Sequence, residues 1–117
     1  MIATTVGITL RAIGPADDSL VARLFIEARP DLDLLPPDVR ETLVPVQVRA
    51  QLAQWSADHP AARHDVICVD RTDVGRVVVA ETETETHLVD LVVLRHHRRR
   101  GIATAVLARL LADADAQ

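Results

Sequence analysis

The chain has 117 residues, of which 49% are hydrophobic and 26% charged, and this composition indicates one globular domain rather than a disordered protein. Its formal net charge of −4 at pH 7 argues against general nucleic-acid binding. A single cysteine excludes an intrachain disulfide and argues against a cysteine-based metal site. The sequence shows neither a signal peptide nor the ~20 apolar residues that a membrane span requires, so we expect a cytoplasmic protein that binds no membrane.

The first part of the chain is expected to form a strand and two helices. Apolar and polar side chains alternate over residues 7–12, which predicts a strand. Residues 17–19 offer N-caps for a helix that continues to about residue 29. The segment 30–45 is polar and interrupted by prolines, with room for short helical turns. Pro45 is predicted to begin the second helix, because proline is favoured at the first helical position.

Three strands are predicted in the middle of the chain, over residues 66–69, 74–80 and 88–94. Residues 71–73 are expected to form the first turn between them. Residues 81–86 alternate acids with threonines, which favours two strand ends joined by a hairpin turn. The third strand is almost entirely apolar, as is typical of a strand buried on both faces.

A last helix is predicted after Gly101, with an apolar stripe at helical spacing. The stripe consists of Ala103, Leu107, Leu110 and Ala114. The element order is then strand, two helices, three strands and a helix, which predicts a mixed α/β sheet with short antiparallel hairpins.

The junction before the last helix has the features of an anion site. Residues 95–100 contain four of the 13 arginines, and they lead directly from an apolar strand into a helix. The first amides of a helix are unpaired and carry the positive end of its dipole, so they bind phosphate oxygens. Gly101 allows close approach of a ligand to the backbone. From spacing alone, a small-anion site and a solvated arginine-rich turn both stay open.

The hexapeptide Arg98-Arg-Arg-Gly-Ile-Ala103 resembles motif A of the GNAT superfamily of N-acetyltransferases, whose signature is Arg/Gln-x-x-Gly-x-Gly/Ala. Residues 87–94 resemble the fourth strand of that family, residues 74–76 the start of its third strand, and residues 8–13 its opening strand. The resemblance covers nearly the whole chain. It implies a GNAT-like acyl-CoA N-acyltransferase fold, an α/β (α+β) domain with a mixed sheet, over residues 1–117.

By that resemblance, the chain uses acetyl-CoA as co-substrate and transfers the acetyl group directly to an amine of a small molecule or peptide. The backbone of Leu91, Val92 and Val93 is expected to pair with the pantetheine arm as an added strand would. An amide near Val93 is expected to stabilise the oxyanion. Arg98 takes the leading position of the motif. The pyrophosphate is expected at the amides of Arg99, Arg100, Gly101, Ile102, Ala103 and Thr104.

The sequence departs from the family pattern at its end. A full member continues with a fifth strand, a fourth helix and a final hairpin, so we expect an incomplete, truncated domain, a fragment or one completed by another chain. The family's usual general acid is a tyrosine of the fourth helix, and this sequence contains no tyrosine. The strand from Leu88 to Leu94 would keep one unpaired edge. We therefore expect self-association through this edge and the helix that follows Gly101.

A general base must remove a proton from the ammonium group of the acceptor. The candidates are Glu81, His87 and Asp90. Asp90 is the strongest because it interrupts an otherwise apolar strand. The alternative is a carboxylate that faces solvent or caps a neighbouring loop.

Other polar side chains have simpler interpretations. His96 and His97 lack further ligands for a metal, so they are expected beside phosphates or in solvent. Two further functions stay open: an inactive remnant that binds acyl-CoA or a partner chain, and a nucleic-acid module, against which the acidity argues. Acids of the segment 30–45 form either a solvated loop or a wall that attracts a cationic amine: Asp31, Asp33, Asp38 and Glu41.

Overall fold

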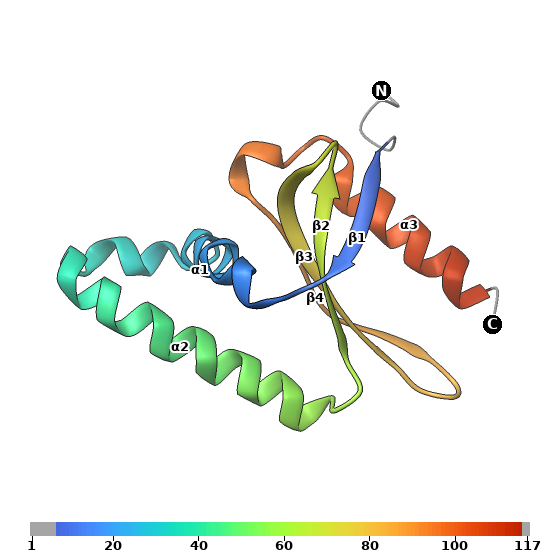
Figure 1. Ribbon diagram of the computed structural model, residues 1–117, viewed down its shortest axis with the longest axis horizontal. Helices are drawn as coiled ribbons and strands as arrows, with labels where there is room; N and C mark the ends of the chain where they lie inside the picture. Colours follow the sequence, from blue (N-terminus) through green and yellow to red (C-terminus); the bar gives the residue numbers. More distant parts are fainter. Residues whose placement is uncertain (1–6, 116–117) are drawn as a thin grey trace.

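The computed structural model describes residues 7–115. Helices α1 and α2 lie on one side of a central sheet and α3 lies on the other (Figure 1). The predicted mixed α/β fold is confirmed. Its elements, in chain order, are β1 (Ile8–Ala12), η2 (Pro15–Asp17), α1 (Asp18–Glu27), η3 (Pro30–Leu34), α2 (Pro37–Asp58), β2 (Arg63–Val69), β3 (Thr72–Glu81), β4 (Thr86–Val93), η4 (Arg95–His97) and α3 (Ile102–Asp115).

Within the described residues, four strands form one antiparallel sheet in the order β1-β2-β3-β4. Asp70 and Arg71 join β2 to β3 with φ angles of 50° and 72°, the left-handed backbone that a two-residue hairpin turn needs. This turn lies one residue earlier than predicted, and β2 and β3 are both longer than predicted. The hairpin turn predicted in the acid/threonine run is confirmed, because residues 82–85 join β3 to β4.

A bulge in β4 decides which of its side chains face which layer. Val78 pairs with Asp90 and Val79 with Leu88, so Val89 has no partner in β3. A one-residue shift moves every later side chain to the opposite face. After the bulge, Leu91 packs with the α3 cluster, while Asp90 lies on the face covered by α1 and α2.

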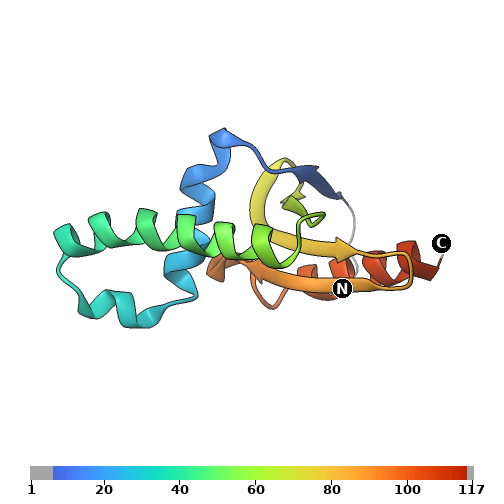
Figure 2. The same cartoon turned by 90° about the horizontal axis from the view of Figure 1, so that it is seen from below.

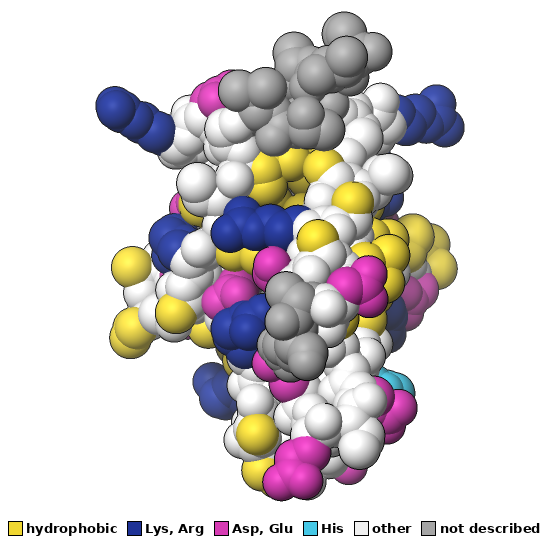
Figure 3. All heavy atoms as spheres, turned by 90° about the vertical axis from the view of Figure 1, so that its right-hand side faces the viewer, with side chains coloured by type: hydrophobic (Ala, Val, Ile, Leu, Met, Phe, Trp, Pro, Cys, Tyr) yellow, Lys and Arg dark blue, Asp and Glu magenta, His cyan; other side chains and the backbone are white. Residues whose placement is uncertain are grey.

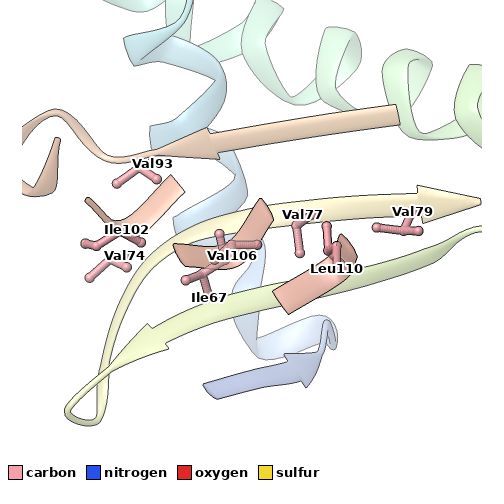
Figure 4. Packing of buried hydrophobic residues seen from close by; sticks show 8 residues of the cluster. All are labelled: Ile67, Val74, Val77, Val79, Val93, Ile102, Val106 and Leu110. Atoms are coloured by element: carbon pink, nitrogen blue, oxygen red, sulfur yellow. The ribbon is translucent and has the colours of Figure 1, made fainter. Parts of the chain in front are cut away.

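Eight buried aliphatic residues join α3 to the sheet (Figure 4). At one end of this cluster Val93 lies beside Ile102 and Val74, and at the other end Leu110 lies beside Val79 (Figure 4). Burial of each such side chain contributes about 1.5–3 kcal/mol. The packing therefore fixes the end of β4 against the first turn of α3. A second cluster covers the α1 side of the sheet and consists of Leu20, Leu24, Val66, Cys68 and Leu94.

The start of α2 corrects the sequence prediction. The helix begins at Pro37 rather than Pro45, and Pro45 lies inside it. Pro37 is equally suited to a first helical position. The missing amide of Pro45 removes one helical hydrogen bond, but the adjacent Val44 lies in a buried cluster with Phe25 of α1 and Leu32. Figure 2 shows η3 and the first half of α2 extending away from the sheet.

The buried face of α3 also differs from the prediction. Ile102, Val106 and Leu110 face the sheet, whereas Ala103 and Leu107 are exposed. The helix is apolar on most of its surface, so two overlapping stripes fit its periodicity equally well. Packing on β3 and β4 selects one of them.

The strand β4 is not buried on both faces, contrary to the sequence prediction. It is the edge strand of the described sheet, and Leu88 is 43% exposed. Leu107 and Leu111 of α3 are exposed as well. On the side shown in Figure 3, exposed hydrophobic side chains form several groups between arginines and acids. No helix within residues 7–115 has the length and apolar character to cross a membrane.

Candidate functional site

The site begins where β4 leaves the sheet. The amide of Leu94 donates to the carbonyl oxygen of Val74 at 2.7 Å. By the alternation of an antiparallel strand, the amide and carbonyl of Val93 then point toward the free edge of β4. The carbonyl accepts a hydrogen bond from Arg98 Nε at 2.8 Å. This bond ties the following loop back onto the strand, while the Val93 amide faces outward.

The loop between η4 and α3 has an unusual backbone. Arg99 and Gly101 adopt left-handed conformations, with φ angles of 64° and 76°. Gly101 adopts this conformation without steric cost, but a residue with a Cβ does so at a cost in energy. Such backbone strain is concentrated at functional sites in proteins. The conformation of Arg99 therefore marks this loop as a candidate site.

The first turn of α3 presents free amides. Ala105 donates its amide to the carbonyl oxygen of Gly101 at 2.9 Å. The amides of Ile102, Ala103 and Thr104 precede this first bond and have no intrahelical acceptor, as at any helix start. They carry the positive end of the helix dipole. The arrangement is suited to binding an anion such as a phosphate.

A cleft of about 380 Å³ follows this junction from the end of β4 to the first turn of α3. Every residue predicted to bind coenzyme A lines it except Arg100. His97 lines the cleft too. The sequence alone left open whether this residue lies beside phosphates or in solvent. The lining residues are Leu91, Val92, Val93, His97, Arg98, Arg99, Gly101, Ile102, Ala103 and Thr104.

The charge of the cleft is positive, because two arginines and no acid are among its lining residues. Partial burial, reinforced by the charges of Arg100, His96 and Arg23, lowers the pKa of His97 below its usual 6.5. At neutral pH His97 is therefore uncharged. A bound anion would oppose these effects and favour the protonated ring.

Comparison with known proteins assigns the family. The family model described as the acetyltransferase (GNAT) family matches residues 28–117. The chain belongs to the GNAT acetyltransferase family. The predicted family is therefore confirmed for most of the chain. No curated protein matches this GNAT chain.

Solved structures share the fold of this GNAT domain. An acetyltransferase from Thermus thermophilus is 22% identical with a TM-score of 0.66, and the match covers 96% of this chain and 72% of that one. PaiA N-acetyltransferase from Thermoplasma acidophilum, in complex with coenzyme A, is 12% identical with a TM-score of 0.58, covering 90% and 70%. A predicted acetyltransferase from Clostridium acetobutylicum, with acetyl-CoA, is 17% identical with a TM-score of 0.52, covering 92% and 73%.

Asp90 lies on the opposite face of β4 from Leu91 and Val93. Its side chain is 31% exposed, and its Oδ2 accepts a hydrogen bond from Arg76 Nε at 3.1 Å. Asp90 lies three positions before Val93, which is roughly 10 Å along a strand. Asp90 is thus partly open to solvent and held in place near the end of the cleft.

The other two predicted bases lie far from Val93. His87 is six residues before Val93, roughly 20 Å along the strand. Its ring stacks on that of His59, with centroids 5.5 Å apart. Glu81 accepts a hydrogen bond from Arg63 Nη1 at 3.3 Å. Both side chains are exposed at the β3–β4 hairpin, so the structure does not bring them together with Asp90 at the cleft.

Sequence reasoning missed the position of Arg76 beside Asp90. Its side chain is 4% exposed, and its guanidinium lies over the ring of Trp55, 4.8 Å from the centroid. Arg76 Nη2 donates to Gln51 Oε1 at 3.2 Å. Burial lowers the pKa of this arginine. The available signal was the one basic residue of the valine-rich strand β3, opposite in sign to Asp90 in β4.

Gly75 lets β3 and β4 approach closely beside the site. It pairs with Val93. A Cβ at this position would lie 3.1 Å from Val93 Cα and still closer to the carbonyl oxygen of Val92. The glycine therefore sets the position of the strand end that lines the cleft.

The acids of the segment 30–45 lie in η3 and the start of α2, away from the sheet (Figure 2). Asp31 pairs with Arg29 at 2.9 Å and Asp33 with Arg40 at 3.2 Å. Arg29 lowers the pKa of Asp31 by a direct hydrogen bond. Within residues 7–115, no three His, Cys, Asp or Glu side chains gather closely enough to hold a metal ion.

Proposed function

We propose that this GNAT domain is an N-acetyltransferase that moves the acetyl group of acetyl-CoA directly to an amine of a small molecule or peptide. The observation that carries this proposal is one cleft that joins the free edge of β4 to the free amides of α3. The chemistry of the co-substrate is complementary, because its amide-bearing arm suits a strand edge and its pyrophosphate suits a helix start.

In this proposal the pantetheine arm lies along Leu91, Val92 and Val93. The outward amides and carbonyls of alternate residues hydrogen-bond its amides, as an added strand would. The pyrophosphate lies at the loop and the first turn of α3, where backbone amides supply most of the binding and the exposed arginines add charge. The residues assigned to it are Arg98, Arg99, Arg100, Gly101, Ile102, Ala103 and Thr104.

The reaction requires an uncharged amine. The ammonium group of the acceptor gives one proton to a base, for which we propose the Asp90 carboxylate. The amine nitrogen then attacks the thioester carbonyl carbon, and the new oxyanion is stabilised by the outward Val93 amide. Collapse breaks the carbon–sulfur bond, the second proton of the nitrogen passes to the leaving thiolate, and coenzyme A departs as its thiol.

A second candidate is binding of acyl-CoA without turnover. It is favoured by the position of Asp90, which lies on the opposite face of β4 from Val93 and pairs with Arg76. A well-placed general acid or base contributes roughly 10²–10⁴-fold to a rate. This second candidate shares the cleft with the first one and differs in the chemical step.

Calorimetric titration with acetyl-CoA, followed by thiol release with a panel of amines, amino acids and short peptides, tests the proposal. We expect saturable binding, and thiol release that depends on an amine, with the acetylated amine identified by mass spectrometry. Binding without amine-dependent release would favour the second candidate. Absence of acetyl-CoA binding would contradict both.

A further inference from the structure

Glu27 breaks a local rule of helix stability. It is the last residue of α1, where a negative charge opposes the helix dipole. The last turn of α1 contains no basic residue to offset it. A residue that violates a local rule commonly has a partner elsewhere in the fold or a role in function.

The partner of Glu27 is the backbone of the candidate site. Its Oε1 accepts a hydrogen bond from the amide of Arg95 at 2.6 Å, across 68 positions of sequence. Arg95 is the first residue of η4, directly after β4 has left the sheet. Its amide has no strand partner to bind, and a carboxylate acceptor gives a short, charge-assisted bond.

This bond holds the turn that leads into the loop. Leu94 is held by β3, and Arg95 is held by α1. The amide of His97 then donates to the carbonyl oxygen of Leu94 at 2.9 Å, and Arg98 returns to Val93 through its side chain. The turn is therefore held at two successive residues, at Leu94 by the sheet and at Arg95 by α1.

We propose that Glu27 is a positioning residue for pyrophosphate binding, acting through the amide of Arg95. This inference rests on the proposed function, because it assumes that coenzyme A occupies the cleft. Glu27 does not contact the ligand in this account. It fixes the geometry of η4 and so aligns the amides of the loop and of α3 before the ligand binds.

Whether substitution of Glu27 tightens or weakens coenzyme A binding distinguishes an electrostatic role from a positioning role. A carboxylate close to a phosphate site repels the anion, so removal of its charge should tighten coenzyme A binding if the long-range field is all that matters. Loss of a positioning bond should weaken binding. Glu27→Gln removes the charge and keeps an oxygen acceptor, whereas Glu27→Ala removes both.

The test is calorimetric titration of the parent, Glu27→Gln and Glu27→Ala with coenzyme A and with pantetheine, which lacks the pyrophosphate. Asp58→Ala is the matched control, since Asp58 is also an acid at the last residue of a helix and bonds Gln54 of its own helix at 2.9 Å. We expect Glu27→Ala to weaken coenzyme A binding about tenfold, as for loss of one charge-assisted hydrogen bond. The affinity of Glu27→Ala for pantetheine should stay within about threefold of the parent's. The affinities of Glu27→Gln and Asp58→Ala for coenzyme A should also stay within about threefold of the parent's.

Amide hydrogen exchange at Arg95 gives a readout that needs no ligand. We expect slow exchange in the parent and fast exchange in Glu27→Ala. Parent-like coenzyme A affinity in Glu27→Ala, or equal losses for coenzyme A and pantetheine, would overturn the inference while leaving the proposed function intact. A parent that does not bind coenzyme A would overturn the proposed function itself and the inference with it.

Discussion

Arg76 Nε donates a hydrogen bond to Asp90 Oδ2 across 3.1 Å, and this pair joins β3 to β4 on the face covered by α2. Arg76 is buried under Trp55, whereas Asp90 keeps an exposed side. Asp90 is the carboxylate that Arg76 pairs with in the described structure. The stability of the buried cation therefore depends on a residue that we also propose for catalysis.

Asp90→Asn should destabilise the fold, because it leaves the buried guanidinium of Arg76 without a counter-charge. We expect a loss of about 2 kcal/mol in the free energy of unfolding by urea, below the value for a fully buried pair because Asp90 is partly exposed. Glu81→Gln breaks the exposed pair with Arg63 and should cost at most about 0.5 kcal/mol. Equal effects of the two substitutions would show that Arg76 does not need Asp90.

The Arg76–Asp90 pair shows why a correct hairpin prediction did not reveal that these two residues pair. In a regular β3–β4 hairpin extended from the Glu81–Thr86 pair, Arg76 and Asp90 would lie on opposite faces. The unpaired Val89 shifts the register by one residue and brings them to the same face. Sequence alternation identified both strands but contained no signal for this bulge.

Gly75→Ala should disturb the cleft from the neighbouring strand. The added Cβ would collide with the backbone of Val92 and Val93, so β4 must move or the sheet must strain. We expect a loss of about 2 kcal/mol in unfolding free energy and weaker coenzyme A binding. Gly14→Ala is the control, because nothing lies within 4 Å of a Cβ there. Similar stabilities for the two variants would contradict the close approach.

His97 should take up a proton when coenzyme A binds. The pKa of the His97 ring lies below its usual 6.5, so the ring is neutral near that pH, and a bound phosphate would favour its protonated form. Affinity for coenzyme A should therefore rise as the pH falls below 6.5. Titrations at pH 6 in buffers of different ionisation enthalpy would measure the proton uptake. His97→Gln should abolish it, and an unchanged uptake would exclude His97 as the group.

Helix prediction failed where the sequence offered two equivalent signals. Pro37 and Pro45 both suit a first helical position, and the helix was predicted to begin at the second of them. The earlier start buries Val44 in a cluster with Phe25 of α1, and this packing between helices is a tertiary effect that local sequence does not show. In contrast, the loop after β4 was located correctly, because an apolar strand, an arginine run and a glycine before a helix are local features.

Self-association through β4 and α3 stays a prediction. The described edge of β4 is unpaired, and Leu88 and Leu111 beside it are 43% and 66% exposed. Such edges pair with further strands unless charged residues block them. Light scattering at micromolar concentration should show a dimer or larger species, and Leu88→Lys should shift it toward the monomer. A strictly monomeric parent would contradict this expectation.

The central claim is that the backbone around Gly101 binds the pyrophosphate of coenzyme A, and Gly101→Asp tests it most directly. The substitution adds a side chain at a left-handed position, φ 76°, and a negative charge at the start of α3. Arg99→Ala removes one exposed arginine and serves as the comparison. Calorimetric titration with coenzyme A should show binding by the parent, a moderate loss for Arg99→Ala and no binding by folded Gly101→Asp. Parent-like affinity in Gly101→Asp would contradict the assignment of the site.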